Sequence, residues 1–272
     1  MSASSSGLEQ RNRLVTSAQN PRVKRLRALL DAPDKSGSEF AFEGDNLLVE
    51  SSRAKLKLTT VFLAESRSPG SLSTLNSAGA EIISLPDSLF RSVVATEAPQ
   101  GVAAIAKRPE FSLRQVLEAK NPLILIAGSI QDPGNLGTLI RSADAFGAAG
   151  VLTLPGTVSA WNQKALRASA GSTFRLPVVE ITASELEVLK QHGVRLYAAL
   201  ANGDLSANEM SLRGPSAILV GNEGAGLPPD LIAFADSLVT IPCVGPVESL
   251  NAAVAGSILL YEASQARSRG AQ

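Results

Sequence analysis

The chain has 272 residues, of which 44% are hydrophobic, and its 25 basic and 25 acidic side chains cancel. It is long enough to bury a substantial core, and its overall charge gives no reason to expect a polycationic nucleic-acid binder. The single cysteine, Cys243, excludes an intramolecular disulfide and a cysteine-rich zinc site. No apolar run approaches the ~20 residues that span a bilayer, and the Ser-rich start lacks the apolar stretch of a signal peptide, so we expect a soluble cytoplasmic protein.

Positive charge is concentrated at the front of the chain. Residues 1–30 contain one acidic side chain, Glu9, and a set of basic ones: Arg11, Arg13, Arg22, Lys24, Arg25 and Arg27. From Pro21 onward apolar residues recur at helical spacing, which predicts an amphipathic helix. These residues are Val23, Leu26, Leu29 and Leu30. A basic arm of this kind contacts phosphates in some proteins and is a solvated tail in others, and both interpretations stay open.

The rest of the first half alternates short strand-like runs with helical patterns near residues 45–56, 71–78 and 86–95. The runs are FAFEG, TTVFLA, EIISL and GVAAIA. This alternation predicts a small α/β domain. Charge and proline then interrupt the apolar pattern in KRPEFSLRQVLEAKNP, which indicates a linker. The expected organisation is a disordered tail over residues 1–12, a small domain over 13–108, a linker over 109–121 and a second domain over 122–272.

The second half holds runs that are apolar almost throughout. They are PLILIAGS, GVLTLPG, RLPVVEI, RLYAALA, AILVGNE and SLVTIPC. Such runs predict strands buried on both faces, and hence a mostly parallel sheet with helices on each side. A helix is predicted over residues 135–146, where Arg141 lies about 100° from Ile140 of the apolar stripe and is free to face a cleft or solvent. His192, the only histidine, is expected on the surface near a helix end, which argues against a Ser-His-Asp mechanism.

Three loops that follow these strands are rich in glycine and polar residues. They are QDPGNLG, GNEGAGLPPD and the segment over residues 241–263, in which a helix is expected to begin near Ser249. Ligands of open α/β sheets bind where such loops converge, and glycine lets the backbone approach a ligand closely. Each loop also has an ordinary explanation: Asn135 and Ser249 can be helix N-caps, and Glu223 can be a solvated carboxylate. The absence of a G-x-G-x-x-G fingerprint argues against a dehydrogenase.

The order of the three loops resembles the motifs of one family. N-x-G-x-x-x-R at residues 135–141, G-N-E-G-x-G at 221–226, and I-P followed by S-L-N-A-A-V-A at 249–255 are similar to the three motifs of the SpoU family of RNA ribose 2′-O-methyltransferases, within the SPOUT superfamily. The similarity covers residues 121–267 and includes WNQKALRASAGS, which precedes the second motif. The first half, from SAQNPRVKRL onward, resembles the L30e-like substrate-binding domain that many members carry.

The resemblance implies a C-terminal domain with a deep trefoil knot, and S-adenosylmethionine held among the knotted loops. It implies contacts to this cofactor, largely through backbone, at Leu200, Gly221, Gly226, Ile241 and Leu250. Apolar walls and backbone hydrogen bonds suit an adenine ring, whereas the methyl group that is transferred must point toward the substrate.

The resemblance also implies catalytic positions. Arg141 matches the catalytic arginine of the family, and its other polar active-site positions are matched by Asn135, Glu223, Ser249 and Asn251, which would orient Arg141, the ribose or the loops. A guanidinium is essentially never deprotonated at neutral pH, so we expect Arg141 to stabilise the developing alkoxide or to clamp a phosphate. No metal is implied, because a sulfonium already has a good leaving group.

The implied partner is RNA, contacted at Arg22, Lys24 and Arg25. Ribosomal RNA, the 23S molecule above all, is preferred because an L30e-like domain suits a large structured target. The alternatives are a tRNA 2′-O-methyltransferase and a non-catalytic RNA-binding or ribosome-assembly protein with the same fold. The presence of Arg141 and Asn135 argues against the second of these. The resemblance also implies a homodimer through the C-terminal domain, and the helix over residues 249–266, which has small and apolar residues on more than one face, agrees with it.

Overall fold

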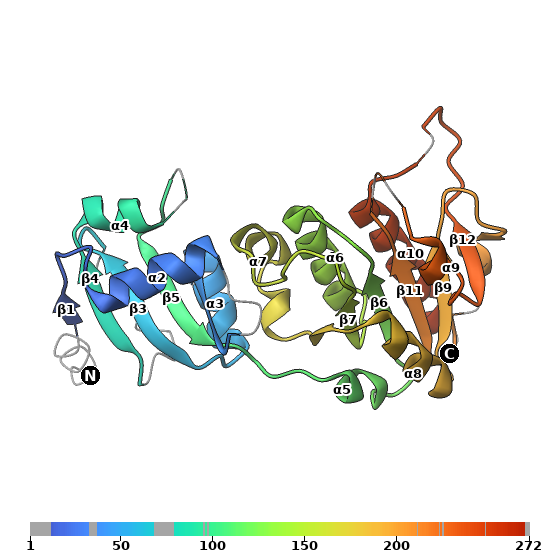
Figure 1. Cartoon of the computed structure of the whole chain (residues 1–272), viewed down its shortest axis with the longest axis horizontal. Helices are drawn as coiled ribbons and strands as arrows, with labels where there is room; N and C mark the ends of the chain where they lie inside the picture. The colour runs from blue at the N-terminus through green and yellow to red at the C-terminus, as the bar shows by residue number, and fades with distance from the viewer. Residues whose placement is uncertain are drawn as a thin grey trace. The chain divides into compact units, whose positions relative to one another are not determined.

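The chain folds into two units, each with its own sheet (Figure 1). The computed structural model describes residues 12–32, 37–67, 79–94, 96, 98–210, 212–222, 224, 226–247 and 249–269. Unit 1 takes the chain up to Pro109 together with Trp161–Phe174, and unit 2 takes Glu110–Ala160 and the chain from Arg175 onward. The chain therefore runs from unit 1 into unit 2, returns to unit 1 for residues 161–174, and ends in unit 2.

Unit 1 is built on a five-stranded sheet in the order β1-β4-β3-β5-β2. Its elements are β1 (Asn12–Leu14), α2 (Pro21–Asp31), β2 (Glu39–Glu43), α3 (Asp45–Arg53), β3 (Leu58–Ala64), β4 (Glu81–Leu85), α4 (Asp87–Val93), β5 (Val102–Lys107), α7 (Gln163–Ser169) and the 3-10 helix η2 (Ser172–Phe174). β1 and β3 run parallel to β4, whereas β5 runs antiparallel to β3 and β2. The four strands predicted for this half are confirmed as β2 to β5.

Two predictions for this half fall wholly or partly on residues that the structure does not describe. The helical pattern near residues 71–78 lies outside the described residues, and so does the predicted tail as far as residue 11. Asn12, the last residue of that predicted tail, lies in β1, which pairs with β4. Three residues are too few to display a strand period, so the pattern does not predict β1.

The predicted basic helix is confirmed as α2. Asn20 caps it by accepting a hydrogen bond from the amide of Arg22 at 2.9 Å, and Pro21 stands in its first turn. The predicted apolar stripe is buried at each of its positions: Val23, Leu26, Leu29 and Leu30. α2 and α4 pack on one face of the sheet, and α3 packs on the other.

The returning segment, residues 161–174, completes the core of unit 1. The ring centroid of Trp161 lies 4.5 Å from that of Phe40, and the Phe174 centroid lies 5.5 Å from those of Phe40 and Phe42. Gln163 donates a hydrogen bond from Nε2 to the carbonyl of Ala41 at 2.7 Å, which attaches α7 to β2. Phe40, Phe42 and Phe174 are all buried, so this face of the sheet depends on residues far along the chain.

Unit 2 is built on a seven-stranded sheet in the order β10-β12-β9-β11-β6-β7-β8, and every neighbouring pair is parallel. Its strands are β6 (Leu123–Ala127), β7 (Gly150–Thr153), β8 (Val178–Glu180), β9 (Arg195–Ala199), β10 (Leu205–Ser206), β11 (Ser216–Val220) and β12 (Ser237–Thr240). The predicted parallel sheet is confirmed, with each predicted run forming a strand. Only the two-residue edge strand β10 is additional.

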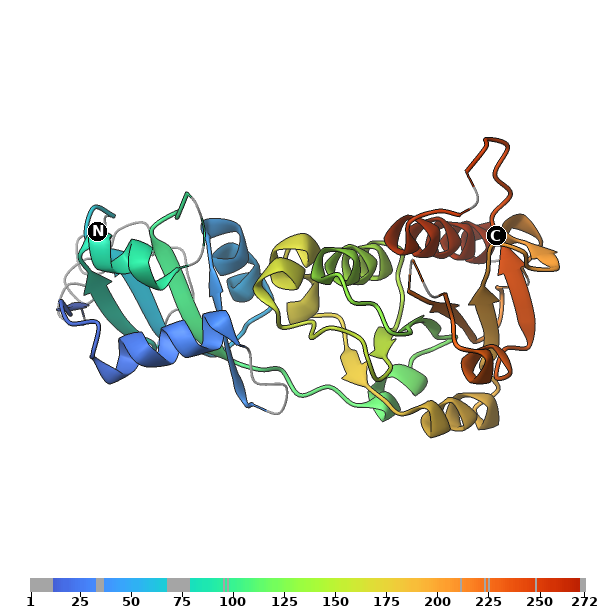
Figure 2. The same cartoon turned by 45° about the horizontal axis from the view of Figure 1, so that its top comes forward.

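Helices cover both faces of this sheet, as predicted (Figure 2). They are α5 (Leu113–Leu117), α6 (Pro133–Ala145), α8 (Leu186–Gln191), α9 (Pro229–Ile232) and α10 (Ala252–Arg269), with the 3-10 helices η3 (Ala183–Glu185) and η4 (Ala207–Glu209). α6 and α10 pack on one face, and α5, α8 and α9 pack on the other. α5 lies in the segment where the sequence indicates a linker, and a capping box between Ser112 and Gln115 begins it.

The N-cap alternatives for two candidate site residues are wrong. α6 is capped by Asp132, whose carboxylate accepts a hydrogen bond from the amide of Asn135 at 2.9 Å. α10 begins at Ala252, and the side chain of Asn251 accepts hydrogen bonds from the amides of Ala253 and Val254. Neither Asn135 nor Ser249 is therefore committed to capping a helix.

Two further predictions concern the position of His192 and the hydropathy of the helices. His192 is exposed and stands at the C-cap of α8, as predicted. Among the helices that the structure describes, none combines the length and the hydropathy needed to cross a bilayer.

Arg267 attaches the end of α10 to the amino-terminal edge of the unit 2 sheet. Its guanidinium is half-buried and donates hydrogen bonds to four backbone carbonyls: Leu212, Asn121, Pro122 and Gly214. Pro122 precedes β6 and Gly214 lies just before β11, so one side chain joins three elements. Burial lowers the pKa of this guanidinium, which nevertheless stays charged because the ordinary value is so high.

We predict that Arg267→Met lowers the free energy of unfolding by about 2 kcal/mol, because buried carbonyls lose their donor while the aliphatic stem is largely kept. Urea-induced unfolding followed by circular dichroism measures the change. Arg269→Met is the matched control, since Arg269 is exposed in the same helix. Equal destabilisation by the two substitutions would show that the hydrogen bonds from Arg267 to the carbonyls do not contribute to the free energy of unfolding.

Candidate active site

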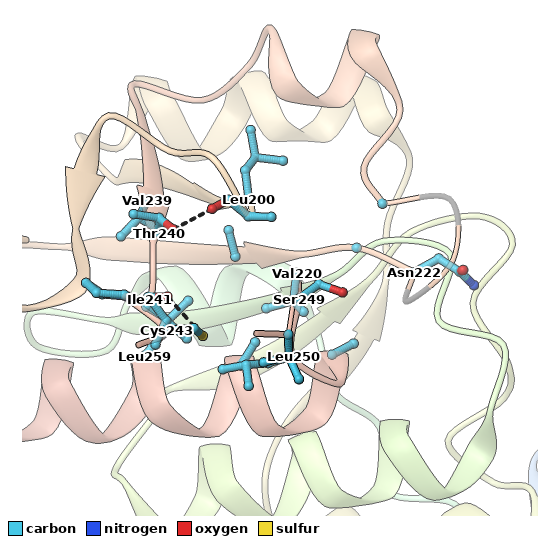
Figure 3. Close-up of a pocket in the computed structure, with 18 of the residues that line it drawn as sticks. Leu200, Val220, Asn222, Val239, Thr240, Ile241, Cys243, Ser249, Leu250 and Leu259 are labelled. Atoms are coloured by element: carbon cyan, nitrogen blue, oxygen red, sulfur yellow. Dashed lines mark hydrogen bonds between the residues drawn. The ribbon is translucent and has the colours of Figure 1, made fainter. Parts of the chain in front are cut away.

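A pocket of about 550 Å3 opens at the carboxyl ends of β9, β11 and β12 (Figure 3). The strand ends and the loops after them supply most of its walls, and the start of α10 supplies the remainder. Its lining residues are Ala199, Leu200, Ala201, Val220, Gly221, Asn222, Gly224, Gly226, Val239, Thr240, Ile241, Pro242, Cys243, Val247, Ser249, Leu250, Ala252, Ala255 and Leu259. The volume lies in the range of small-molecule sites, which pair apolar walls with a few polar groups.

The loop after β11 is folded back on itself by backbone hydrogen bonds. The amide of Asn222 donates to the carbonyl of Gly226 at 3.1 Å, and the amide of Gly226 donates to the carbonyl of Asn222 at 2.9 Å. Gly226 has a φ of +67°, which favours glycine. A Cβ atom at Gly221 would lie 2.6 Å from the carbonyl carbon of Gly226 and 2.8 Å from Cγ of Leu227. The closed loop therefore requires glycine at position 221.

The loop after β9 is joined to the end of β12. The amide of Leu200 donates to the carbonyl of Val239 at 2.9 Å, and the hydroxyl of Thr240 donates to the carbonyl of Ala201 at 2.8 Å. Figure 3 shows Leu200 and Ile241 coming to the pocket from the loops after β9 and β12. Since these hydrogen bonds use backbone carbonyls, they hold the walls in place without filling the pocket with polar side chains.

Side-chain amides connect the loop after β6 to the other two loops. Asn222 donates from Nδ2 to the carbonyl of Ser129 at 3.1 Å, and Asn251 donates from Nδ2 to Oδ1 of Asn135 at 3.3 Å. Ser129 has a φ of +56°, so its backbone is in the left-handed region that non-glycine residues seldom adopt. The three polar loops singled out in the sequence are thus one connected group in the structure.

Arg141 is exposed on α6, and within the described part of the chain no carboxylate forms an ion pair with it. It is not among the residues that line the pocket. An arginine without an internal counter-ion keeps its fork of donors available for an external anion or phosphate.

The structure brings most of the predicted site residues together. The predicted cofactor contacts Leu200, Gly221, Gly226, Ile241 and Leu250 all line the pocket, and so does Ser249. Asn135 and Asn251 form the hydrogen-bonded pair described above. Glu223 lies outside the described residues. Among the described residues, no group of three or more His, Cys, Asp or Glu side chains could hold a metal ion.

Sequence reasoning missed some pocket residues. Asn222 stands inside the quoted G-N-E-G-x-G motif, so the signal for it was present in the pattern. Thr240 and Cys243 flank the predicted Ile241, but only the hydrogen bond from Thr240 to the loop after β9 shows that the position matters. That bond joins residues far apart in the sequence, which no local pattern reveals.

The predicted RNA contacts lie on α2 in unit 1, and two of the three are ion-paired. Nε of Arg22 lies 2.8 Å from Oε2 of Glu81, and Nη2 of Arg25 lies 3.4 Å from Oε2 of Glu39. Lys24 has no ion pair with any residue that the structure describes. These pairs are exposed and therefore weak, but they reduce the positive field that the sequence alone attributes to the helix.

The fold and the pocket define an α/β protein that binds a small molecule at the carboxyl edge of a parallel sheet. Residues 122–261 match the SpoU rRNA methylase family, and residues 20–104 match the MRM3-like substrate-binding domain. The chain belongs to the SpoU rRNA methylase family.

Named relatives match most of the chain. A Bacillus subtilis (strain 168) protein, the 23S rRNA (guanosine(2553)-2'-O)-methyltransferase RlmP, is 35% identical over 250 residues, which cover 91% of this chain and 97% of that protein. A 23S rRNA (uridine(2479)-2'-O)-methyltransferase of Streptomyces viridochromogenes is 32% identical over 197 residues, which cover 70% of this chain and 69% of that protein. The crystal structure of the SpoU methyltransferase AviRb from Streptomyces viridochromogenes, in complex with the cofactor AdoMet, is similar with a TM-score of 0.82 and 28% identity, over 92% of this chain and 98% of that one.

Proposed function

We propose that this chain transfers the methyl group of S-adenosylmethionine to the 2′-hydroxyl of a ribose in 23S ribosomal RNA. The observation that carries the proposal is the connected group of loops: a pocket at the carboxyl ends of β9, β11 and β12, and the hydrogen-bonded pair Asn135 and Asn251, which joins the pocket loops to α6. The similarity to RlmP of Bacillus subtilis over 91% of the chain supports both the reaction and the ribosomal substrate. The match to a substrate-binding domain in unit 1 supports a large RNA partner.

The residues of the pocket fit the cofactor. Leu200, Ile241 and Leu250 offer apolar surface for an adenine ring, and the turns at Gly221 and Gly226 bring backbone to the pocket wall without a Cβ atom. When bound, S-adenosylmethionine supplies a methyl group on a positively charged sulfur, which is electrophilic without help from a metal. The chain's own part is to hold that group and to exclude water around it.

The polar residues act on the ribose. As its 2′-oxygen gains the methyl group, the hydroxyl gives up its proton to water or to a phosphate oxygen of the RNA. Arg141 stays protonated and stabilises the negative charge that develops on the oxygen, or holds the neighbouring phosphate. Asn135 and Asn251 fix each other's orientation, and Ser249 presents a hydroxyl at the pocket wall. Glu223 remains a candidate for orienting the loops.

We also propose that α2 binds RNA and that the C-terminal domain contains a trefoil knot. Lys24 supplies a cation on α2 that forms no ion pair with any residue in the described part of the chain, and Arg22 and Arg25 contribute once RNA phosphates compete with their carboxylate partners. Leu250, which precedes α10, lines one pocket with the loops after β9 and β11, and this closeness supports a trefoil knot formed by the chain's last segment.

The experiment is methyl transfer from labelled S-adenosylmethionine to unmodified 23S ribosomal RNA, with tRNA as the comparison, followed by mapping of 2′-O-methylated nucleotides. We expect one modified ribose in 23S RNA. Modification of tRNA alone would show that the substrate is tRNA and not 23S ribosomal RNA. Cofactor binding without methyl transfer to either RNA would favour the non-catalytic alternative.

For Arg141 we predict that Arg141→Ala lowers kcat by about 100-fold while the Kd for S-adenosylmethionine changes less than about twofold, because the charge matters only as the alkoxide develops. Arg141→Lys is also expected to fail, since it loses the planar fork. Single-turnover kinetics and calorimetry give the two values. Arg213→Ala, at an exposed arginine elsewhere in unit 2, is the control. Near wild-type kcat in either Arg141 variant would disprove the role.

For the pocket we predict that Gly221→Ala weakens S-adenosylmethionine binding by about tenfold or more, because the added Cβ meets the backbone of Gly226. Gly214→Ala is the control in unit 2, because Gly214 does not line the pocket and an added Cβ there meets no atom within 4 Å. Calorimetry on both variants measures the Kd for S-adenosylmethionine. Equal affinities would place the cofactor away from this loop.

We also propose a homodimer through the C-terminal domain. Val254 and Tyr261 of α10 are 48% and 47% exposed, an apolar surface that pairing would cover. Light scattering at micromolar concentration is expected to give twice the chain mass of 28.2 kDa, and the double variant Val254→Arg, Tyr261→Arg is expected to be monomeric. A wild-type monomer would refute the dimer.

A further inference from the structure

α6 and α10 run in the same direction and touch at four successive places. Asn135 meets Asn251, Leu139 packs against Gly256, Ser142 meets Ser257, and Phe146 meets Tyr261 with ring centroids 5.7 Å apart. The contacts follow the same order along both helices, so one side of α6 faces α10 from the first turn of α6 to its end. Arg141 is carried on this helix, directly before the third contact.

The apolar part of this interface brings the helices close together. A Cβ atom at Gly256 would lie 2.4 Å from Cδ2 of Leu139, and Leu139 is itself fully buried. A contact between a leucine and a glycine fixes the separation of two helices, but it has no directional preference. Small sliding or rotation of α6 therefore has to be limited by something else.

The directional contact is a chain of two hydrogen bonds. The hydroxyl of Ser257 donates to the carbonyl of Ala253 at 2.6 Å, and the oxygens of Ser142 and Ser257 are 2.7 Å apart. A serine hydroxyl has one proton, so Ser257 accepts from Ser142 while it donates to Ala253. The side chain of Ser142 is thus tied, through Ser257, to the backbone of α10.

We infer that Ser257, together with Ser142, is a positioning residue for Arg141, and this inference rests on the proposed function. Ser142 follows Arg141 by one residue, which is 1.5 Å along the helix axis. The guanidinium stands at the end of a long side chain, so a rotation of α6 displaces it further than it displaces the backbone. The serine pair holds α6 at one rotation relative to α10, whose first residues line the pocket.

Stability alone gives little reason for hydroxyls at these positions. Replacing a helical serine by alanine raises the helix propensity, which offsets much of the stability that is lost with one hydrogen bond. Ser257→Ala is therefore expected to fold normally, and its kinetics report on position.

The test compares Ser257→Ala with Ser268→Ala in the full-length chain. The hydroxyl of Ser268 donates to the carbonyl of Ser264 at 2.9 Å, so the control removes the same kind of bond from the same helix at an exposed position. We expect Ser257→Ala to lower kcat about tenfold, with KM for RNA and Kd for S-adenosylmethionine unchanged, and Ser268→Ala to change none of them. Ser257→Thr restores a hydroxyl and is expected to recover kcat.

A double-mutant cycle and hydrogen exchange complete the test. Ser142→Ala combined with Ser257→Ala is expected to lower kcat no further than either change alone, because both remove one link. Amide exchange of residues 136–141 is expected to accelerate in Ser257→Ala and not in Ser268→Ala. Unchanged kcat in Ser257→Ala, or an equal effect of the control, would overturn the inference. If the wild-type chain transfers no methyl group, the proposed function fails, and the exchange measurement still decides whether Ser257 holds α6.

Discussion

The parallel pairing of β6, β9, β11 and β12 is the constraint on which the site depends. Parallel strands open their carboxyl ends at one edge, so the loops that follow them must meet there. Residues that are separated by more than a hundred positions, such as Asn135 and Asn251, come within hydrogen-bonding distance for this reason. An antiparallel arrangement of the same strands would send alternate loops to opposite edges.

The division of labour within the site follows from the kind of group that each loop offers. The loops after β9, β11 and β12 surround the pocket with backbone and apolar side chains, which recognise a ligand's shape without adding charge. The cation is kept apart, on α6, where it has no internal counter-ion among the described residues. Charge stabilisation is most effective when the charged group is already oriented before the reaction, so the packing of α6 belongs to the chemistry as much as the pocket does.

Much of this architecture can be predicted from the sequence, because strands buried on both faces leave uninterrupted apolar runs. β6 and β11 are clear examples. The motifs after β11 and β12 contain Gly221, Ile241 and Leu250, which line one pocket. Features that depend on contacts between residues far apart in the sequence cannot be predicted in this way. Glu81 and Glu39 neutralise part of the charge on α2. No sequence pattern near Arg22 or Arg25 predicts these ion pairs. The short helix α5 is hidden for a local reason, since its capping box lies in a charged, proline-interrupted segment.

The return of residues 161–174 to unit 1 has a consequence for biosynthesis. Translation delivers the strands of the first sheet early, but Trp161 and Phe174, which pack on Phe40 and Phe42, are made only after β6, α6 and β7 have been synthesised. Until then the nascent chain presents uncovered aromatic rings on one sheet face. The first unit therefore finishes folding late and is not an autonomous module that emerges complete from the ribosome, so its maturation is tied to the synthesis of the unit that follows it.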